Sequence, residues 1–202
     1  MEIQRFTGGM VMTNSYLLDG KVLVDAPEGV CQWLKDLGET PTTLLLTHQH
    51  YDHVESVAEL QAAGVKVYAY APYSKELTLE NFLALQGRPM TVQPYEIDEE
   101  LAGTMADGVG ELSVEGLDFA LMHIPGHSPD SVAFQYNDQV FAGDTLFAGG
   151  IGRPDLPGGD QKLLLDGIQK HLLVQAPETV VFPGHGPETS VGRELAFHGI
   201  TG

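Results

Sequence analysis

The stretch Thr47-His48-Gln49-His50-Tyr51-Asp52-His53 decides how this sequence is interpreted, because four of its seven residues have side chains that bind metal ions. It directly follows the apolar run Leu44-Leu45-Leu46, which predicts a buried strand that ends where these side chains begin. Imidazoles and carboxylates suit zinc, iron and manganese, whereas a hydrophobic core gains nothing from crowded titratable groups. The stretch therefore predicts a metal site at a strand end, and with it a metalloenzyme.

Three more potential ligands occur in the same setting, a small turn that closes an apolar strand. They are His127 after Ile124-Pro125-Gly126, Asp144 after Phe141-Ala142-Gly143, and His185 after Phe182-Pro183-Gly184. Strand ends at one edge of a sheet converge in space, so we expect these side chains to join the first four. Seven ligands are too many for one tetrahedral zinc ion and suit two ions that share a bridging carboxylate and a bridging water.

Each of these residues also has an explanation without metal. Asp52 could cap a helix that begins at His53, with Glu55 completing a capping box. Asp144 could be a turn residue, and His127 and His185 could be ordinary loop histidines. The joint occurrence of all seven at strand ends favours the metal hypothesis, whereas the histidines outside this setting are predicted to be structural: His123, His171 and His198.

Composition narrows the class of protein. The 202 residues, 43% of them hydrophobic, with a mean hydropathy of -0.05, predict one globular domain over residues 1–202. No segment approaches the run of about 18 apolar residues that a membrane span needs, and the N-terminus has no secretory signal, which predicts a cytoplasmic protein without membrane association. The formal charge of -18 disfavours nucleic acid as a partner. The single cysteine, Cys31, is expected to be a half-buried packing residue.

The order of elements predicts mixed sheets covered by helices. Hairpins are expected across Asp19-Gly20, Glu115-Gly116 and Asn137-Asp138, and interior strands at 44–46, 65–70 and 180–182. Helical patterns cover residues 30–37, 54–60 and 164–172. Residues 86–107 are interpreted as a surface connection, and the glycine-rich segment 147–160 as a structured loop that shapes a pocket.

The pattern T-H-x-H-x-D-H followed by single His, Asp and His residues resembles the metallo-beta-lactamase superfamily, and all seven positions are filled. The resemblance implies an α/β fold, a four-layered αβ/βα sandwich in which helices flank two mixed sheets. It also implies which residues bind each metal ion: His48, His50 and His127 the first, Asp52, His53 and His185 the second, and Asp144 both.

Further motifs resemble the glyoxalase II branch of that superfamily. They are Val24-Asp25-Ala26, Gly143 to Phe147, Gly152-Arg153-Pro154-Asp155-Leu156-Pro157-Gly158-Gly159, and Pro183 to Glu194. An Asp at the bridging position, where the main zinc beta-lactamases have Cys, indicates the same branch. This resemblance implies hydrolysis of a small-molecule thioester of the hydroxyacylglutathione type, with Asp25 supporting the metal ligands from behind.

The implied cofactors are two divalent ions, zinc in the first place and iron or manganese as alternatives. Two such ions lower the pKa of a shared water from about 15.7 to near 7, so hydroxide can attack the thioester carbonyl at neutral pH. Asp52 could receive a proton during turnover. Arg153 and Asp155 either shape the substrate pocket or form a salt bridge that fixes the glycine-rich loop, and we favour the salt bridge.

The sequence departs from the family pattern at two points, and it leaves two alternative activities. Asp130 stands where the family usually has Gly, and the chain ends 17 residues after His185, which leads us to expect no C-terminal helical glutathione-binding domain. The main alternative is a persulfide (sulfur) dioxygenase with one iron held by His48, His127 and Asp144. The second is hydrolysis of a lactone or another ester. The oligomeric state is not predicted.

Overall fold

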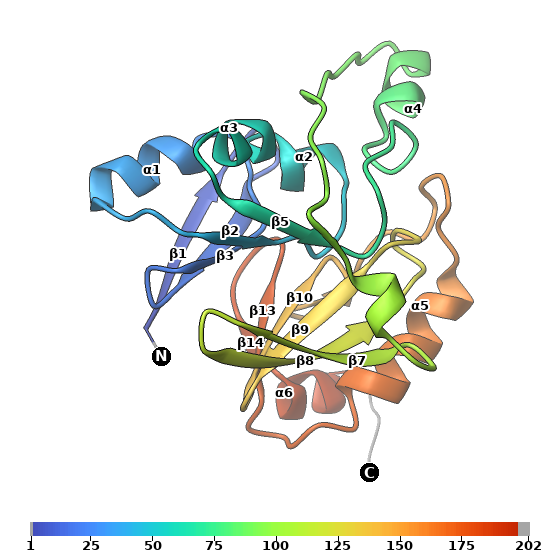
Figure 1. Ribbon diagram of the computed structural model, residues 1–202. Helices are drawn as coiled ribbons and strands as arrows, with labels where there is room; N and C mark the ends of the chain where they lie inside the picture. The colour runs from blue at the N-terminus through green and yellow to red at the C-terminus, as the bar shows by residue number, and fades with distance from the viewer. Residues whose placement is uncertain (1, 198–202) are drawn as a thin grey trace. The chain divides into compact units, whose positions relative to one another are not determined.

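The computed structural model describes residues 2–197, and the chain divides into two compact units, residues 1–103 and 104–202. Each unit contains one six-stranded mixed sheet and its own helices (Figure 1). The predicted class, two mixed sheets flanked by helices, is therefore confirmed. Among the described residues, none of the helices is long and apolar enough to cross a membrane.

The strands of the first sheet follow each other in sequence order. They are β1 (Ile3–Gly8), β2 (Thr13–Leu18), β3 (Val22–Val24), β4 (Thr43–Leu45), β5 (Lys66–Ala69) and β6 (Glu99–Glu100). The first three are antiparallel, and β3 to β6 run parallel. The predicted hairpin across Asp19-Gly20 is confirmed: both residues have positive φ, 47° and 69°, as a tight two-residue turn requires.

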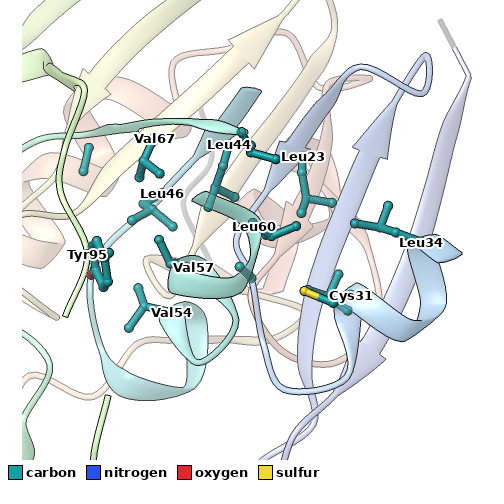
Figure 2. Packing of buried hydrophobic residues seen from close by; sticks show 14 of the residues in the cluster. Leu23, Cys31, Leu34, Leu44, Leu46, Val54, Val57, Leu60, Val67 and Tyr95 are labelled. Carbon is teal, nitrogen blue, oxygen red and sulfur yellow. The ribbon is translucent and has the colours of Figure 1, made fainter. Parts of the chain in front are cut away.

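The helices of this unit are α1 (Val30–Leu37), α2 (Tyr51–Val54), α3 (Val57–Ala62) and α4 (Glu80–Leu85). α1 buries Val30, Cys31 and Leu34 and ends at Gly38, as predicted. Figure 2 shows Cys31 and Leu34 packed with residues of α3 and the parallel strands, in a cluster that also contains Val30. The helix expected over 54–60 is instead two short helices, because the Ser56 backbone N–H donates to the Ala26 carbonyl at 2.9 Å and not to a carbonyl one helical turn earlier.

The interpretation of residues 86–107 as a surface connection is wrong for part of the segment. Val92 and Tyr95 are buried in the core of the first unit. The Tyr95 hydroxyl also donates a hydrogen bond to Gln49 Oε1 at 2.9 Å. Proline and glycine make this backbone irregular, but they do not prevent its apolar side chains from filling the core.

The second sheet has the order β14-β13-β10-β9-β8-β7, with β10 and β13 parallel and the other pairs antiparallel. Its strands are β7 (Val109–Val114), β8 (Leu117–His123), β9 (Val132–Tyr136), β10 (Gln139–Gly143), β13 (Val180–Pro183) and β14 (Thr189–Ser190). The hairpins predicted across Glu115-Gly116 and Asn137-Asp138 are both confirmed.

The other elements of the second unit are α5 (Gln161–Gly167), the π-helical turn η2 (Ile168–Leu172), α6 (Val191–Phe197), and the short pair β11 (Leu146–Phe147) and β12 (Gly150–Ile151). The 3₁₀ turn η1 (Leu101–Thr104) precedes them at the boundary of the units. Leu164, Ile168 and Leu172 pack with strand residues such as Val140 and Val181 in one core. The predicted helical pattern over 164–172 is confirmed as α5 continued by η2.

Candidate metal centre

The first unit brings its four predicted ligands together at the end of β4 and in α2. His48, His50, Asp52 and His53 are all buried. The His48 ring centroid lies 4.6 Å from that of His50 and 4.1 Å from that of His53, and His53 Nε2 lies 3.5 Å from Asp52 Oδ2. The side chains therefore form one array in the order His50, His48, His53, Asp52, which we call the first array.

Asp52 does not cap a helix. α2 begins at Tyr51, and the residue at its N-cap is His50, whose side chain makes no capping hydrogen bond. Asp52 Oδ2 accepts a hydrogen bond from Thr13 Oγ1 at 2.6 Å, and Glu55 Oε2 accepts one from the Glu28 backbone N–H at 3.1 Å. The capping-box alternative is therefore wrong, because both carboxylates have partners elsewhere.

Asp25 fixes residues of the first array by hydrogen bonds. Its backbone has a left-handed conformation, with φ of 58°. Its Oδ1 accepts the Thr47 backbone N–H, and its Oδ2 accepts both Thr47 Oγ1 and His53 Nδ1, each at 2.8 Å. Since the Thr47 hydroxyl proton points to Asp25, the contact of 3.2 Å between Thr47 Oγ1 and His48 Nδ1 has His48 as the donor. Both imidazoles thus have a proton on Nδ1, so in the neutral form each would bind a metal ion through Nε2.

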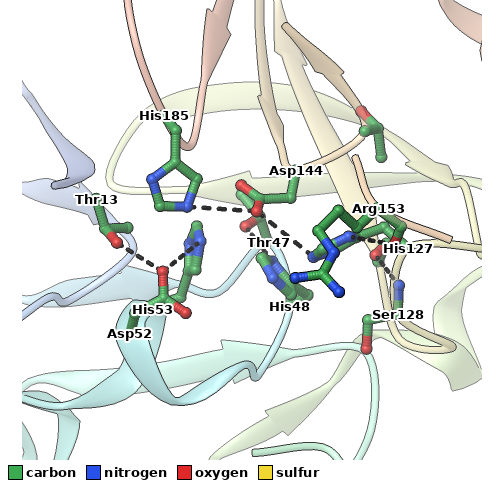
Figure 3. A network of polar contacts seen from close by, with 12 residues as sticks. Thr13, Thr47, His48, Asp52, His53, His127, Ser128, Asp144, Arg153 and His185 are labelled. Carbon is green, nitrogen blue, oxygen red and sulfur yellow. Dashed lines mark hydrogen bonds and ion pairs between the residues drawn. The ribbon is translucent and has the colours of Figure 1, made fainter. Parts of the chain in front are cut away.

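The second unit forms a second array from the ends of three elements. His127 follows β8, Asp144 follows β10 and His185 follows β13. Asp144 Oδ2 lies 3.4 Å from Nε2 of His127 and 3.4 Å from Nε2 of His185 (Figure 3). His127 and Asp144 are buried, whereas the His185 side chain is 27% exposed. One carboxylate oxygen therefore sits between two imidazoles, and the second array has the order His127, Asp144, His185.

The glycine-rich loop fixes this second array. His127 Nδ1 donates to the Arg153 carbonyl at 3.0 Å, and since a carbonyl only accepts, the neutral form of this imidazole would bind a metal ion through Nε2. A Cβ on Gly152 would lie 1.8 Å from the Asp144 carbonyl oxygen and 3.0 Å from His127 Cγ. The loop backbone thus packs directly on two of the predicted ligands, at a distance that only glycine permits.

Arg153 and Asp155 form the salt bridge that we favoured. Arg153 donates from Nε and Nη2 to the two oxygens of Asp155 at 3.0 and 2.9 Å. The pair raises the pKa of the guanidinium and lowers that of the carboxyl, but both side chains are mostly exposed, so the contribution to stability is small.

Asp130, where the family usually has Gly, is buried, and its Oδ1 accepts a hydrogen bond from Ser128 Oγ. Its φ is not positive, so the turn uses the side chain and does not need glycine. His123 and His171 belong to neither array, as predicted: burial lowers the pKa of each imidazole, and His123 Nε2 contacts the Pro129 carbonyl at 2.8 Å. His198 lies outside the described residues.

Sequence reasoning assigned no function to Thr13 or to the side chains of Thr47 and Gln49. Gln49 is fully buried, and its Nε2 donates to the Ala71 carbonyl at 2.8 Å while its Oε1 accepts from Tyr95. Its position between His48 and His50, two predicted ligands, was a usable signal for Gln49. No pattern in the sequence connects Thr13 with Asp52, which is 39 residues away.

The donor atoms in each unit fit divalent metal ions. Two ligand atoms bound to one tetrahedral zinc ion at about 2.1 Å are about 3.4 Å apart. The described pairs are separated by 3.4, 3.4 and 3.5 Å. The donor set combines imidazole nitrogens and carboxylate oxygens in buried surroundings, which suits zinc, iron or manganese.

Two mixed sheets with histidine and carboxylate arrays at their strand ends define an α/β protein with a candidate metal centre. Residues 8–185 match the family model of the metallo-beta-lactamase superfamily. The chain belongs to this superfamily.

Two relatives agree with this assignment. The chain is 36% identical to a probable metallo-hydrolase, YqgX, of Bacillus subtilis, over 96% of this chain and 94% of that protein. It is 34% identical to the hydroxyacylglutathione hydrolase GloC of Haemophilus influenzae, over 83% of this chain and 79% of that protein.

Two solved structures are also similar. The BLEG-1 B3 metallo-beta-lactamase has a TM-score of 0.82 at 35% identity, with 96% of this chain and 97% of that chain covered. A di-iron-bound form of TTHA1623 has a TM-score of 0.77 at 35% identity, with 95% and 96% covered.

Proposed function

We propose that the two arrays together bind two divalent metal ions and that the protein hydrolyses thioesters of the hydroxyacylglutathione type. His48, His50 and His127 would hold the first ion, Asp52, His53 and His185 the second, and Asp144 both. One observation underlies the proposal: Asp144 Oδ2 is equally distant, 3.4 Å, from His127 and His185, the two histidines that the resemblance assigns to different ions. A carboxylate in that position suits a bridging ligand.

Two divalent ions would supply a water-derived nucleophile at neutral pH and stabilise the oxyanion of a carbonyl substrate. The residues of the chain would orient the ligands and accept the released proton. Asp25 and Thr47 keep the imidazoles of His48 and His53 in the metal-binding tautomer, and the Arg153 carbonyl does the same for His127. Asp52 could accept the proton released during hydrolysis. His185 is the most exposed of the proposed ligands, so a substrate would approach from its side.

The thioester as substrate is supported by the similarity to GloC and by the glyoxalase II-like motifs around Gly152-Arg153 and His185. The formal charge of -18 argues against nucleic acid, so we propose a small-molecule substrate. We further propose that residues 1–202 are one superfamily domain, since one family model spans residues of both units, and that the protein acts in the cytoplasm.

The similarity to BLEG-1 favours a second candidate, hydrolysis of beta-lactams. The motifs of this chain favour the thioester, because Asp144 and the segment around Gly152-Arg153 resemble the glyoxalase II branch. We therefore rank the thioester first and include a beta-lactam in the test.

The test is metal analysis of the purified protein followed by assays with zinc, manganese and iron reconstituted separately. The substrates are a thioester panel including lactoylglutathione, a lactone, a beta-lactam and a persulfide. We expect two ions per chain and highest kcat/KM on a thioester, with Asp144→Ala losing both metal and activity. One iron per chain with oxygen consumption on the persulfide and no thioesterase activity would overturn the proposal in favour of a dioxygenase.

A further inference from the structure

We propose that Thr13 is a positioning residue that fixes the Asp52 carboxylate for the second metal ion. This inference rests on the proposed function, in which Asp52 and His53 are ligands of that ion. It gives a function to a buried hydroxyl that the superfamily motif does not contain.

The contact between the two side chains is short and shielded from solvent. Thr13 Oγ1 donates to Asp52 Oδ2 at 2.6 Å, and Thr13 is completely buried while Asp52 is nearly so. A hydroxyl bonded to an ionised carboxylate typically lies 2.5–2.7 Å away, and such charge-assisted bonds are about twice as strong as neutral ones. The distance of 2.6 Å is short for a hydroxyl hydrogen bond, so the contact holds Oδ2 of Asp52 closely in place.

Thr13 contacts the same carboxylate oxygen of Asp52 that is proposed to bind the ion. Asp52 Oδ2, which accepts the Thr13 hydroxyl, is also the oxygen 3.5 Å from His53 Nε2 (Figure 3). That separation matches two ligands of one tetrahedral ion, which are about 3.4 Å apart. The hydrogen bond restrains rotation of the carboxylate and so keeps Oδ2 beside His53 Nε2.

Strand β2 positions two of the proposed ligands of this ion, Asp52 and His53. Thr13 and Ser15 are two residues apart and so point to the same face of the strand. Ser15 Oγ donates to the Asp25 carbonyl at 2.7 Å, which supports the left-handed conformation of Asp25. Asp25 in turn accepts His53 Nδ1. Alternate hydroxyls of one strand thus fix Asp52 directly and His53 through Asp25.

The experiment compares Thr13→Val, which keeps the shape and removes the hydroxyl, with Thr13→Ser, which keeps the hydroxyl. Thr7→Val is the matched control: Thr7 lies on β1 of the same hairpin and its Oγ1 bonds to Asn14 Oδ1 at 2.8 Å, not to a proposed ligand. Zinc affinity is measured by competition with a chromophoric chelator, which resolves the two binding steps. Thermal unfolding of the metal-free proteins separates a loss of stability from a loss of metal binding.

We expect Thr13→Val to weaken one zinc-binding step by about 10–100-fold and to leave the other unchanged, since outer partners of metal ligands typically have effects of this size. Thr13→Ser and Thr7→Val should bind both ions as the wild type does. If Thr13→Val does not fold, Thr13→Ala replaces it with the same expectation. Wild-type affinity in the hydroxyl-free variant, or equal losses in Thr13→Ser or Thr7→Val, would overturn the inference.

The outcomes also separate this inference from the proposed function. A wild-type protein that binds two zinc ions but hydrolyses no thioester contradicts the substrate and still tests Thr13, because the readout is affinity. A wild-type protein that binds fewer than two ions contradicts both.

Discussion

Asp25 Oδ2 lies 2.8 Å from His53 Nδ1, and Asp25 adopts a φ of 58° to make this contact. A non-glycine residue in the left-handed region is uncommon, although Asp and Asn tolerate it better than other residues. The conformation lets one carboxylate accept three hydrogen bonds, two of them from Thr47 and one from His53. These hydrogen bonds therefore offset the local backbone cost and fix the orientation of the His53 imidazole.

Asp25→Asn is expected to weaken zinc binding by about 10–100-fold. Asn tolerates the same φ, but its NH₂ group must face a donor at either oxygen position, so at least one of the three hydrogen bonds is lost. Unfolding of the metal-free variant in urea should show a loss of about 1–3 kcal/mol. Unchanged zinc affinity in a folded variant would contradict a function for Asp25 in orienting the ligands.

Gly152→Ala is expected to disrupt the second array. Its Cβ would lie 1.8 Å from the Asp144 carbonyl oxygen, so the backbone next to two proposed ligands must shift. Overpacking of this kind costs about 1–3 kcal/mol or more, and displacement of Asp144 should also lower the metal content. Gly150→Ala is the control in the same loop, because a Cβ there meets no atom within 4 Å. Equal metal content and thermal stability in the two variants would contradict this account.

Features that depend on local backbone conformation could be predicted from the sequence, whereas contacts between distant residues could not. The hairpin at Asp19-Gly20 and the end of α1 at Gly38 depend on local backbone conformation, and both were predicted correctly. The residues of both arrays were recognisable because histidine and aspartate recur directly after apolar strands. Thr13 could not be found in this way, since threonine is common in strands and its partner Asp52 is distant in sequence. The burial of Tyr95 was missed for a similar reason, because its partner Gln49 belongs to another element.

Tyr95→Phe tests whether the segment that follows α4 stabilises the first unit through Gln49, the residue between His48 and His50. The substitution keeps the ring in the core and removes the hydroxyl that donates to Gln49 Oε1. A buried acceptor then loses this donor, which costs about 1–3 kcal/mol. The expected result is this decrease in the free energy of unfolding, measured in urea on the metal-free protein. A change within about 0.5 kcal/mol, typical of a surface substitution, would show that water replaces the hydroxyl at no cost.

Cys31 should be a poor nucleophile in the folded protein, because burial raises the pKa of its thiol from 9.0 to about 11. Only the thiolate reacts with iodoacetamide, and a shift of this size reduces its population at pH 8 by about 100-fold. Alkylation of the native protein should therefore be slow and become fast in urea. The same shift affects stability: the unfolded thiol ionises near pH 9.0 while the folded thiol stays neutral up to about pH 11, so the free energy of unfolding should fall as the pH rises between these values. Cys31→Ala should lack this part of the pH dependence, and rapid alkylation of the native protein at pH 8 would contradict the shift.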